Sequence, residues 1–173
     1  EPAIMRFPGK IPAGSVINTP MMTIDMLPTI AKLVGGKMPE KKIDGKDVWP
    51  IITGSSQQSP HEAYFIYYRV NELQAVRSGK WKLYLPHTYR TLNGREGTND
   101  GLPIDYEQTE VTQPELYDLD GDVAETTDVA AANPDVVDRL LKLADGMRAK
   151  LGDSITGVEG TENREPGRVA TPE

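Results

Sequence analysis

The chain has 173 residues, a formal net charge of −7 and no cysteine. This length supports one hydrophobic core and at most a small second layer. Nucleic-acid binding depends on clustered Lys and Arg that release counterions, so the negative charge argues against a nucleic-acid partner. No apolar run approaches the roughly 20 residues of a membrane helix, and the lack of cysteine excludes disulfides, thiolate zinc sites and a cysteine nucleophile.

Two segments near the N-terminus have helical signals. Proline and glycine recur through residues 1–20 and favour extended segments joined by turns. From Thr23 to Val34, apolar residues recur every three or four positions behind Thr23 as a candidate N-cap, with Pro28 near the start. We predict a helix there, and a short helical turn from Trp49 to Gly54.

The middle of the chain predicts a small antiparallel sheet of about four strands. Three strand-length runs cover Glu62–Tyr68, Leu73–Arg77 and Trp81–Leu85. Gly79 lies between the last two runs and can take the positive φ of a tight hairpin, so these strands should be neighbours. A fourth strand is predicted at Pro114–Leu119.

The rest of the chain predicts a long loop, a helix and a tail. The stretch from Pro86 to Pro114 is polar and rich in turn residues, which indicates a functional or mobile loop. Asn133–Leu151 has a helix start and one apolar stripe, so this helix should cover the sheet in an α+β module. Residues 153–173 contain few large apolar side chains and are predicted to be disordered.

Five short motifs follow one another in a fixed order. They are EPAIMRFPGKI at the start, TIDMLPTI before Gly35, IDGKD at 43–47, AVRSGKWKL at 75–83, and ELYDL at 115–119 before Glu125. In this order they resemble segments of the type I sulfatases, the arylsulfatase family of the alkaline phosphatase superfamily. The resemblance extends from Glu1 to about Leu151. It departs from the family pattern at Val123, where proline is usual, and this affects only a turn.

The resemblance implies a sulfuric ester hydrolase that uses a calcium ion and a formylglycine nucleophile made from Cys or Ser in C/S-x-P-x-R. No such motif occurs in this sequence. The metal ligands and sulfate-binding residues belong to the family's upstream region, so we expect no catalytic and no metal-binding residue here. The chain alone should therefore hydrolyse no aryl sulfate.

The resemblance also implies a layout, partners and a location. Residues 1–54 should end the catalytic domain, residues 55–152 should form a C-terminal subdomain of sheet and helix, and residues 153–173 should form the tail. The expected partners are the upstream catalytic region of the same chain and a sulfated carbohydrate or aryl sulfate substrate, without nucleic acid or membrane. The family location is periplasmic or extracellular. Two alternatives stay open: a phosphodiester or phosphonate hydrolase of the same superfamily, and a polyanion-binding module.

The substrate-binding candidates are His87, Tyr89 and Arg90, which follow the third predicted strand. Imidazole, phenol and guanidinium groups can all hydrogen-bond to sulfate or sugar oxygens. The similar segment of many bacterial sulfatases lies near the mouth of the active site, which implies contacts that set substrate specificity. The alternative is a solvated strand end in which His87 and Tyr89 pack locally.

Other polar and aromatic groups favour structural interpretations. No carboxylate occurs between Leu73 and Arg95, but cations in this stretch are typical of a soluble sheet edge as well as of an anion site. The aromatic run at 64–68 fits a strand with one buried face better than a sugar-stacking platform. The acidic segment from Asp118 to Glu125 lacks the glycine and glutamate spacing of an EF-hand, and His61 lacks ligand partners for a metal.

Overall fold

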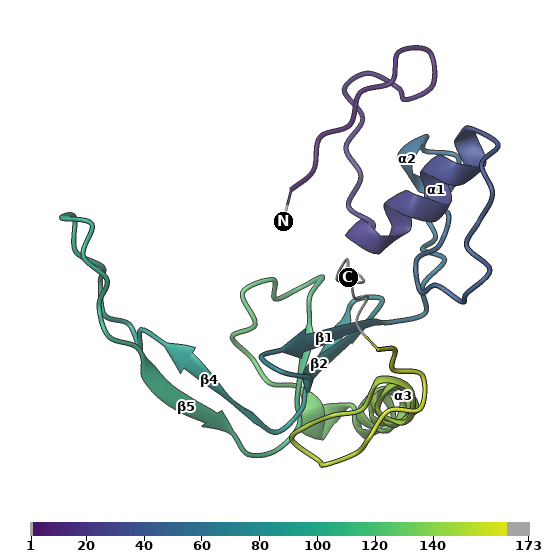
Figure 1. Ribbon diagram of the computed structural model, residues 1–173. Coiled ribbons are helices and arrows are strands. Elements are labelled where there is room, and N and C mark those ends of the chain that lie inside the picture. Colours follow the sequence, from purple (N-terminus) through teal and green to yellow (C-terminus); the bar gives the residue numbers. More distant parts are fainter. Residues whose placement is uncertain (1, 166–173) are drawn as a thin grey trace, which may run out of the picture. The chain divides into compact units, whose positions relative to one another are not determined.

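The computed structural model describes residues 2–165, and the chain divides into two units between Glu62 and Ala63 (Figure 1). We call residues 2–62 the N-terminal unit and residues 63–165 the C-terminal unit. Each unit has a hydrophobic cluster of its own.

The N-terminal unit contains three short helical elements. A 3-10 turn, η1 (Thr23–Asp25), runs directly into α1 (Met26–Leu33), and α2 (Trp49–Ile52) follows later. The predicted helix and helical turn are therefore confirmed in position. Pro28 is the third residue of α1, where its missing N–H has no intrahelical acceptor to lose. The predicted cap at Thr23 is wrong, because Asp25 accepts a hydrogen bond from the Met22 N–H instead, at 2.8 Å.

A buried carboxylate joins three segments of the N-terminal unit that are distant in sequence. Asp25 is fully buried, and its Oδ1 lies 2.9 Å from the Lys46 N and 2.8 Å from the His61 Nε2. Gly45 passes so close to η1 that a Cβ there would lie 2.0 Å from the Ile24 carbonyl oxygen. The glycine of the IDGKD turn is therefore required by this close approach of two backbones.

The C-terminal unit is built on a four-stranded antiparallel sheet. Its strands β1 (Tyr64–Tyr68), β2 (Glu72–Ser78), β3 (Trp81–Tyr84) and β6 (Glu115–Asp118) lie in the order β1-β2-β3-β6. The long helix α3 (Pro134–Leu151) packs against β2 and β3 (Figure 1). The four predicted strands, the pairing of the second with the third, and the α+β fold class are all confirmed.

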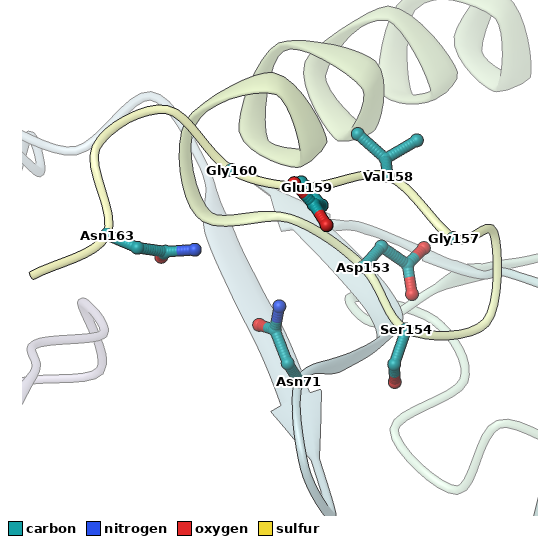
Figure 2. Close-up of a pocket in the computed structure, with 8 residues that line it drawn as sticks. All are labelled: Asn71, Asp153, Ser154, Gly157, Val158, Glu159, Gly160 and Asn163. Atoms are coloured by element: carbon teal, nitrogen blue, oxygen red, sulfur yellow. The ribbon is translucent and has the colours of Figure 1, made fainter.

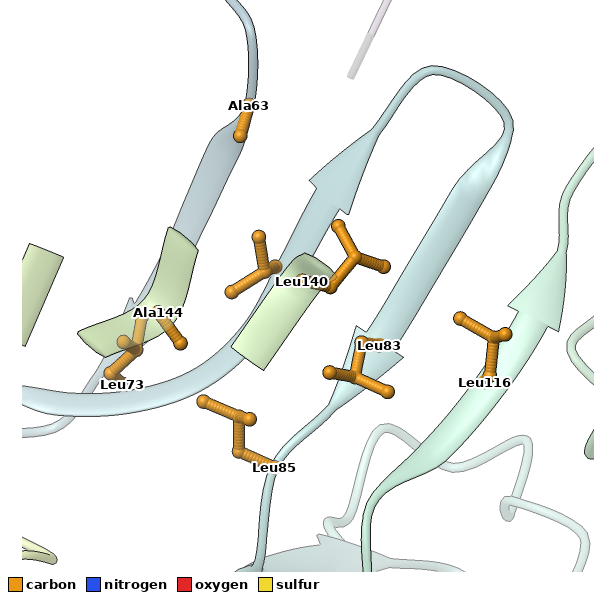
Figure 3. Close-up of a cluster of buried hydrophobic side chains, with 8 residues drawn as sticks. Ala63, Leu73, Leu83, Leu85, Leu116, Leu140 and Ala144 are labelled. Atoms are coloured by element: carbon orange, nitrogen blue, oxygen red, sulfur yellow. The ribbon is translucent and has the colours of Figure 1, made fainter. Parts of the chain in front are cut away.

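The core of this unit lies between the sheet and α3. Figure 3 shows Leu73, Leu83 and Leu116 from the sheet beside Leu140 and Ala144 from the helix, all of them buried. The pairing of β2 with β1 shifts by one residue at Gln74, which has no partner in β1. This bulge changes the side-chain alternation, so residues before and after it can point to the same face of the sheet. Leu73 and Val76 both enter the core as a result.

The predicted loop from Pro86 to Pro114 contains two strands that the sequence analysis missed. β4 (His87–Thr91) and β5 (Glu107–Val111) pair in a separate two-stranded antiparallel sheet, drawn as a ribbon in teal and green in Figure 1. The periodicity signal is absent because only His87 and Val111, the facing pair at one end, are buried. The 3-10 turn η2 (Ala130–Ala132) also lacked a sequence signal.

The predicted disorder of residues 153–173 needs correction at its start. Asp153 is fully buried; its Oδ2 lies 2.8 Å from the Arg148 Nε, and its backbone pairs with Val158. Further hydrogen bonds join Thr161 and Glu162 to the last turns of α3. A buried ion pair rather than apolar area holds this segment, which is why composition did not reveal it. Residues 166–173 lie outside the described part of the chain.

Candidate substrate-binding surface

The three substrate-binding candidates all lie on β4, but they do not share a face. Side chains alternate along a strand, so His87 and Tyr89 lie on one face of the ribbon and Arg90 on the other. His87 is 7% exposed, and its Nδ1 lies 2.6 Å from the Leu85 carbonyl oxygen. Its ring lies between Tyr84 and Tyr89, with centroids 5.7 and 5.8 Å away. His87 is thus a packed residue that supports Tyr89, which is 40% exposed.

Next to His87, the phenols of Tyr84 and Tyr117 form hydrogen bonds with glutamate carboxylates. Tyr84 donates to the Glu125 Oε2 at 2.7 Å, and Lys82 Nζ lies 2.6 Å from the Oε1 of the same carboxylate. Tyr117 similarly donates to the Glu115 Oε2 at 2.8 Å. Burial first, and then the adjoining carboxylates, raise the pKa of Tyr84 and the pKa of Tyr117. Both phenols therefore stay protonated, and this network ties β3 to the loop after β6.

On the other face of β4, Arg90 lies between two exposed phenols. Its Nη2 donates to the Tyr68 Oη at 3.0 Å, and its Cζ lies 5.2 Å from the centroid of the Tyr106 ring. Tyr68 is 46% and Tyr106 55% exposed. Sequence reasoning missed this group because it assigned Tyr68 to a core strand and Tyr106 to a loop.

Most cations of the carboxylate-free stretch 73–95 have acquired acidic partners from elsewhere. Lys80 lies 2.6 Å from Asp118, Lys82 2.6 Å from Glu125, and Arg95 3.5 Å from Glu107. Arg90 forms no ion pair within residues 2–165. Arg77 likewise forms no ion pair in that part of the chain, so the stretch is neutralised only in part. Arg90 differs from Arg77 in that it contacts two exposed phenols.

A hollow lies beside the end of α3. Figure 2 shows this open pocket of about 440 Å³, lined by Asn71, Asp153, Ser154, Gly157, Val158, Glu159, Gly160 and Asn163. Asp153 is bonded to Arg148, and the Asn71 Nδ2 donates to the Leu151 carbonyl oxygen at 2.9 Å. These groups hold the C-terminal segment in place, so the pocket is a weaker candidate than the surface of β4.

The acidic loop after β6 works as a turn. The carboxylate of Asp122 accepts hydrogen bonds from the N–H groups of Thr126 and Thr127, at 2.7 and 2.8 Å. Across the described residues, no group of three or more His, Cys, Asp or Glu side chains could hold a metal ion. No helix among them is long and apolar enough to cross a bilayer.

Comparison with models of protein families identifies the family to which this chain belongs. Residues 59–165, more than half of the chain, match the C-terminal region of aryl-sulfatase, and residues 1–93 match the C-terminal part of N-sulphoglucosamine sulphohydrolase. The chain belongs to the sulfatase family. The resemblance inferred from the five motifs is confirmed.

Named sulfatases are similar to this chain, some of them along most of its length. Human arylsulfatase A is 31% identical over 90% of the chain, and a sulfatase of Formosa agariphila is 30% identical over 91%. Human steryl-sulfatase is 46% identical over 44% of the chain. The matches span only 32%, 28% and 13% of these three relatives, so the sulfatase chain corresponds to a minor share of their length.

Solved structures agree on the fold. A protein from a Bacteroides thetaiotaomicron locus for the metabolism of multiple glycosaminoglycans matches 73% of this chain, with TM-score 0.53 and 25% identity, over 24% of its own length. A protein solved with its substrate D-glucosamine-2-N,6-O-disulfate matches 83% of the chain, with TM-score 0.55 and 20% identity, over 27% of its own length. Each of these matches covers only one part of a larger protein.

Proposed function

We propose that this chain is the C-terminal part of a sulfuric ester hydrolase that removes sulfate from carbohydrates. The match of residues 59–165 to the C-terminal region of aryl-sulfatase carries the proposal. Sulfated sugar is favoured as the substrate class because one matching family acts on N-sulphoglucosamine and one solved neighbour was bound to a disulfated glucosamine. An aryl sulfate would be an artificial or secondary substrate.

The residues of this chain do not fit the family's calcium ion or formylglycine. The sequence has no cysteine and no serine in S-x-P-x-R, and the described residues contain no metal-binding cluster. The nucleophile and the calcium ligands would come from a catalytic region that precedes this segment. The whole enzyme would be periplasmic or extracellular, as in the family the sequence resembles.

The exposed apolar residues of the N-terminal unit support the proposal that this chain packs against a separate catalytic region. Helix α1 and its neighbours leave Ile24, Leu27, Ile30 and Leu33 between 43% and 55% exposed, an apolar stripe that a folded protein normally covers. Residues 1–54 would place that stripe against the catalytic region, and residues 55–152 would form the C-terminal subdomain, together with the segment after Gly152 that is bonded to α3. In this arrangement β4 presents Tyr89, supported by the buried His87, to the sugar on one face, and Arg90 on the other face.

The test is the coding sequence that precedes Glu1 and the enzyme it encodes. We expect a C/S-x-P-x-R motif and desulfation of glucosamine-type substrates by the whole enzyme. The 173-residue chain alone should give no turnover above background, because sulfate ester cleavage needs a nucleophile, a cation and an acid. A plain Thr or Ser nucleophile with two zinc sites and phosphodiesterase activity would favour the related hydrolase and contradict the proposal.

Within the whole enzyme, Tyr89→Ala should raise the KM for a sulfated oligosaccharide several-fold and leave a small aryl sulfate almost unaffected. The loss corresponds to one hydrogen bond of about 0.5–1.5 kcal/mol. Thr88→Ala is the matched control, because Thr88 is exposed on the opposite face of the same strand. Equal effects of Tyr89→Ala on both substrates, or of both variants on the oligosaccharide, would count against a substrate contact at Tyr89.

A further inference from the structure

The group formed by Tyr68, Arg90 and Tyr106 combines features of a binding site. Tyr68 ends β1, Arg90 is the last but one residue of β4, and Tyr106 directly precedes β5, yet Arg90 contacts both tyrosines. We call them the Tyr-Arg-Tyr cluster. Its guanidinium lies near one ring and bonds to the hydroxyl of the other, while both rings remain about half exposed.

The guanidinium of Arg90 has unused capacity for an anion. A guanidinium has five N–H donors, and Arg90 uses one of them in its hydrogen bond to Tyr68. In the described part of the chain, no carboxylate lies within ion-pair distance of Arg90. Across the ribbon Arg90 faces Gln108, and Glu110 on the same face is opposite Thr88 and forms no ion pair with Arg90. The remaining donors match the bidentate geometry of sulfate or carboxylate oxygens.

The two phenols supply the second half of a sugar site. A pyranose ring has an apolar face of C–H groups that packs on an aromatic ring, and hydroxyls that bond to phenol oxygens. Arg90 lies within the antiparallel pairing of β4 with β5, and Tyr106 immediately precedes Glu107, which pairs with Thr91. Backbone pairing therefore fixes the position of Arg90, and its contacts with Tyr68 and Tyr106 orient its guanidinium before any ligand arrives, which lowers the entropy cost of binding.

From this geometry we infer that the Tyr-Arg-Tyr cluster is a subsite for a sugar ring that carries an anionic group, either sulfate or carboxylate. The carbohydrate class rests on the proposed function, whereas the anionic group follows from Arg90 itself. The subsite lies on the face of β4 opposite His87 and Tyr89, so it would hold a different ring of an oligosaccharide from any that contacts Tyr89. The proposal therefore favours polymeric acidic glycans over single sugars.

Binding to the 173-residue chain tests the subsite without any catalysis. Fluorescence anisotropy with a labelled heparin-derived tetrasaccharide should give saturable, salt-sensitive binding. Arg90→Gln should weaken this binding at least about tenfold, as expected for the loss of one charge-assisted contact. Tyr106→Ala should weaken it several-fold, and Tyr68→Phe less, because the ring is kept.

Arg77→Gln is the matched control. It removes the same charge from the same unit, at a side chain whose Nε donates to the Gly79 carbonyl oxygen beside the hairpin turn. It should alter affinity less than about twofold, because screened charges outside a site contribute little. Circular dichroism of each variant establishes that the fold is retained.

The possible outcomes distinguish a failure of the proposed subsite from a failure of the proposed function. Equal weakening by Arg90→Gln and Arg77→Gln would mean diffuse charge attraction and would overturn the subsite, as would the absence of saturable binding by folded chain up to about 1 mM ligand. A desulfated tetrasaccharide identifies the anion: retained affinity points to carboxylate and lost affinity to sulfate, and both support the subsite. Failure of the whole enzyme to desulfate sugars would overturn the proposed function and leave a measured Arg90-dependent affinity standing.

Discussion

Replacing Asp153 by alanine is expected to lower the free energy of unfolding of the C-terminal unit by about 3–5 kcal/mol, the usual cost of breaking a buried ion pair from one side. Arg148, whose side chain is 15% exposed, would keep its charge while losing the partner 2.8 Å from its Nε. The N–H groups of Leu73 and Ile155 would also lose their acceptor, Asp153 Oδ1. Strand β2, the end of α3 and the segment after it all depend on this one carboxylate.

The measurement is urea unfolding followed by tryptophan fluorescence. The sequence has two tryptophans, Trp49 and Trp81, so a Trp49→Phe background leaves Trp81 to report on the C-terminal unit alone. Asp145→Ala is the matched control, because Asp145 also pairs with Arg148, at 2.9 Å, but its side chain is 71% exposed. That variant should cost no more than about 1 kcal/mol. Similar losses in the two variants would contradict a special role for the buried pair.

The dependence of stability on pH provides a second test of the role of Asp153. Burial alone would raise the pKa of Asp153, but the hydrogen bond from Arg148 and the N–H groups of Ile155 and Leu73 outweigh it and hold the pKa below its ordinary value. The folded state therefore favours the charged carboxylate, and its contribution is fully present above the unfolded-state pKa of about 3.9 and lost as pH falls through the folded pKa. In Asp153→Asn, the decline of stability below about pH 4 should be shallower than in the wild type.

The sequence predicts those parts of the fold in which apolar and aromatic side chains form strand-length runs or a helical stripe. The strands of the main sheet and α3 carry Leu73, Leu83, Leu116 and Leu140 into one core, and each was recognisable from its pattern. The ribbon of β4 and β5 has no such pattern, because its pairing joins polar residues such as Arg90 and Gln108. Backbone hydrogen bonds, which every residue type can make, hold it together, so composition favoured a loop.

The sequence predicted the candidate site only in part, because it did not reveal that residues 87–91 form a strand. His87, Tyr89 and Arg90 were chosen as neighbours in sequence, but strand geometry separates neighbours onto opposite faces. Once the segment is known to be a strand, its alternation alone distinguishes the buried His87 from Arg90. Tyr106 could not be linked to Arg90 without the register of β4 against β5, a long-range pairing that no local pattern specifies.

The second large effect is expected at Asp25 in the N-terminal unit. Asp25→Ala removes the acceptor for the N–H groups of Met22 and Lys46 and the partner of His61 Nε2. These hydrogen bonds are part-buried, so each donor left without its acceptor should cost about 1 kcal/mol, the lower end of the usual range, and we expect a total loss of about 3 kcal/mol. The hydrophobic cluster of this unit has only Val48, Ile51 and Ile52 fully enclosed among the described residues, which leaves little apolar burial to offset that loss.

Hydrogen–deuterium exchange read by peptide mass spectrometry can locate the damage. In Asp25→Ala, peptides covering residues 22–53 should exchange far faster, whereas peptides from β2 and β3 should keep wild-type protection. Asp44→Ala is the matched control, since Asp44 is an exposed aspartate one residue before Gly45 in the same turn. Unchanged protection in Asp25→Ala would show that the buried carboxylate is dispensable. Loss of protection in both units would show instead that they unfold as one, against the division of the chain at Ala63.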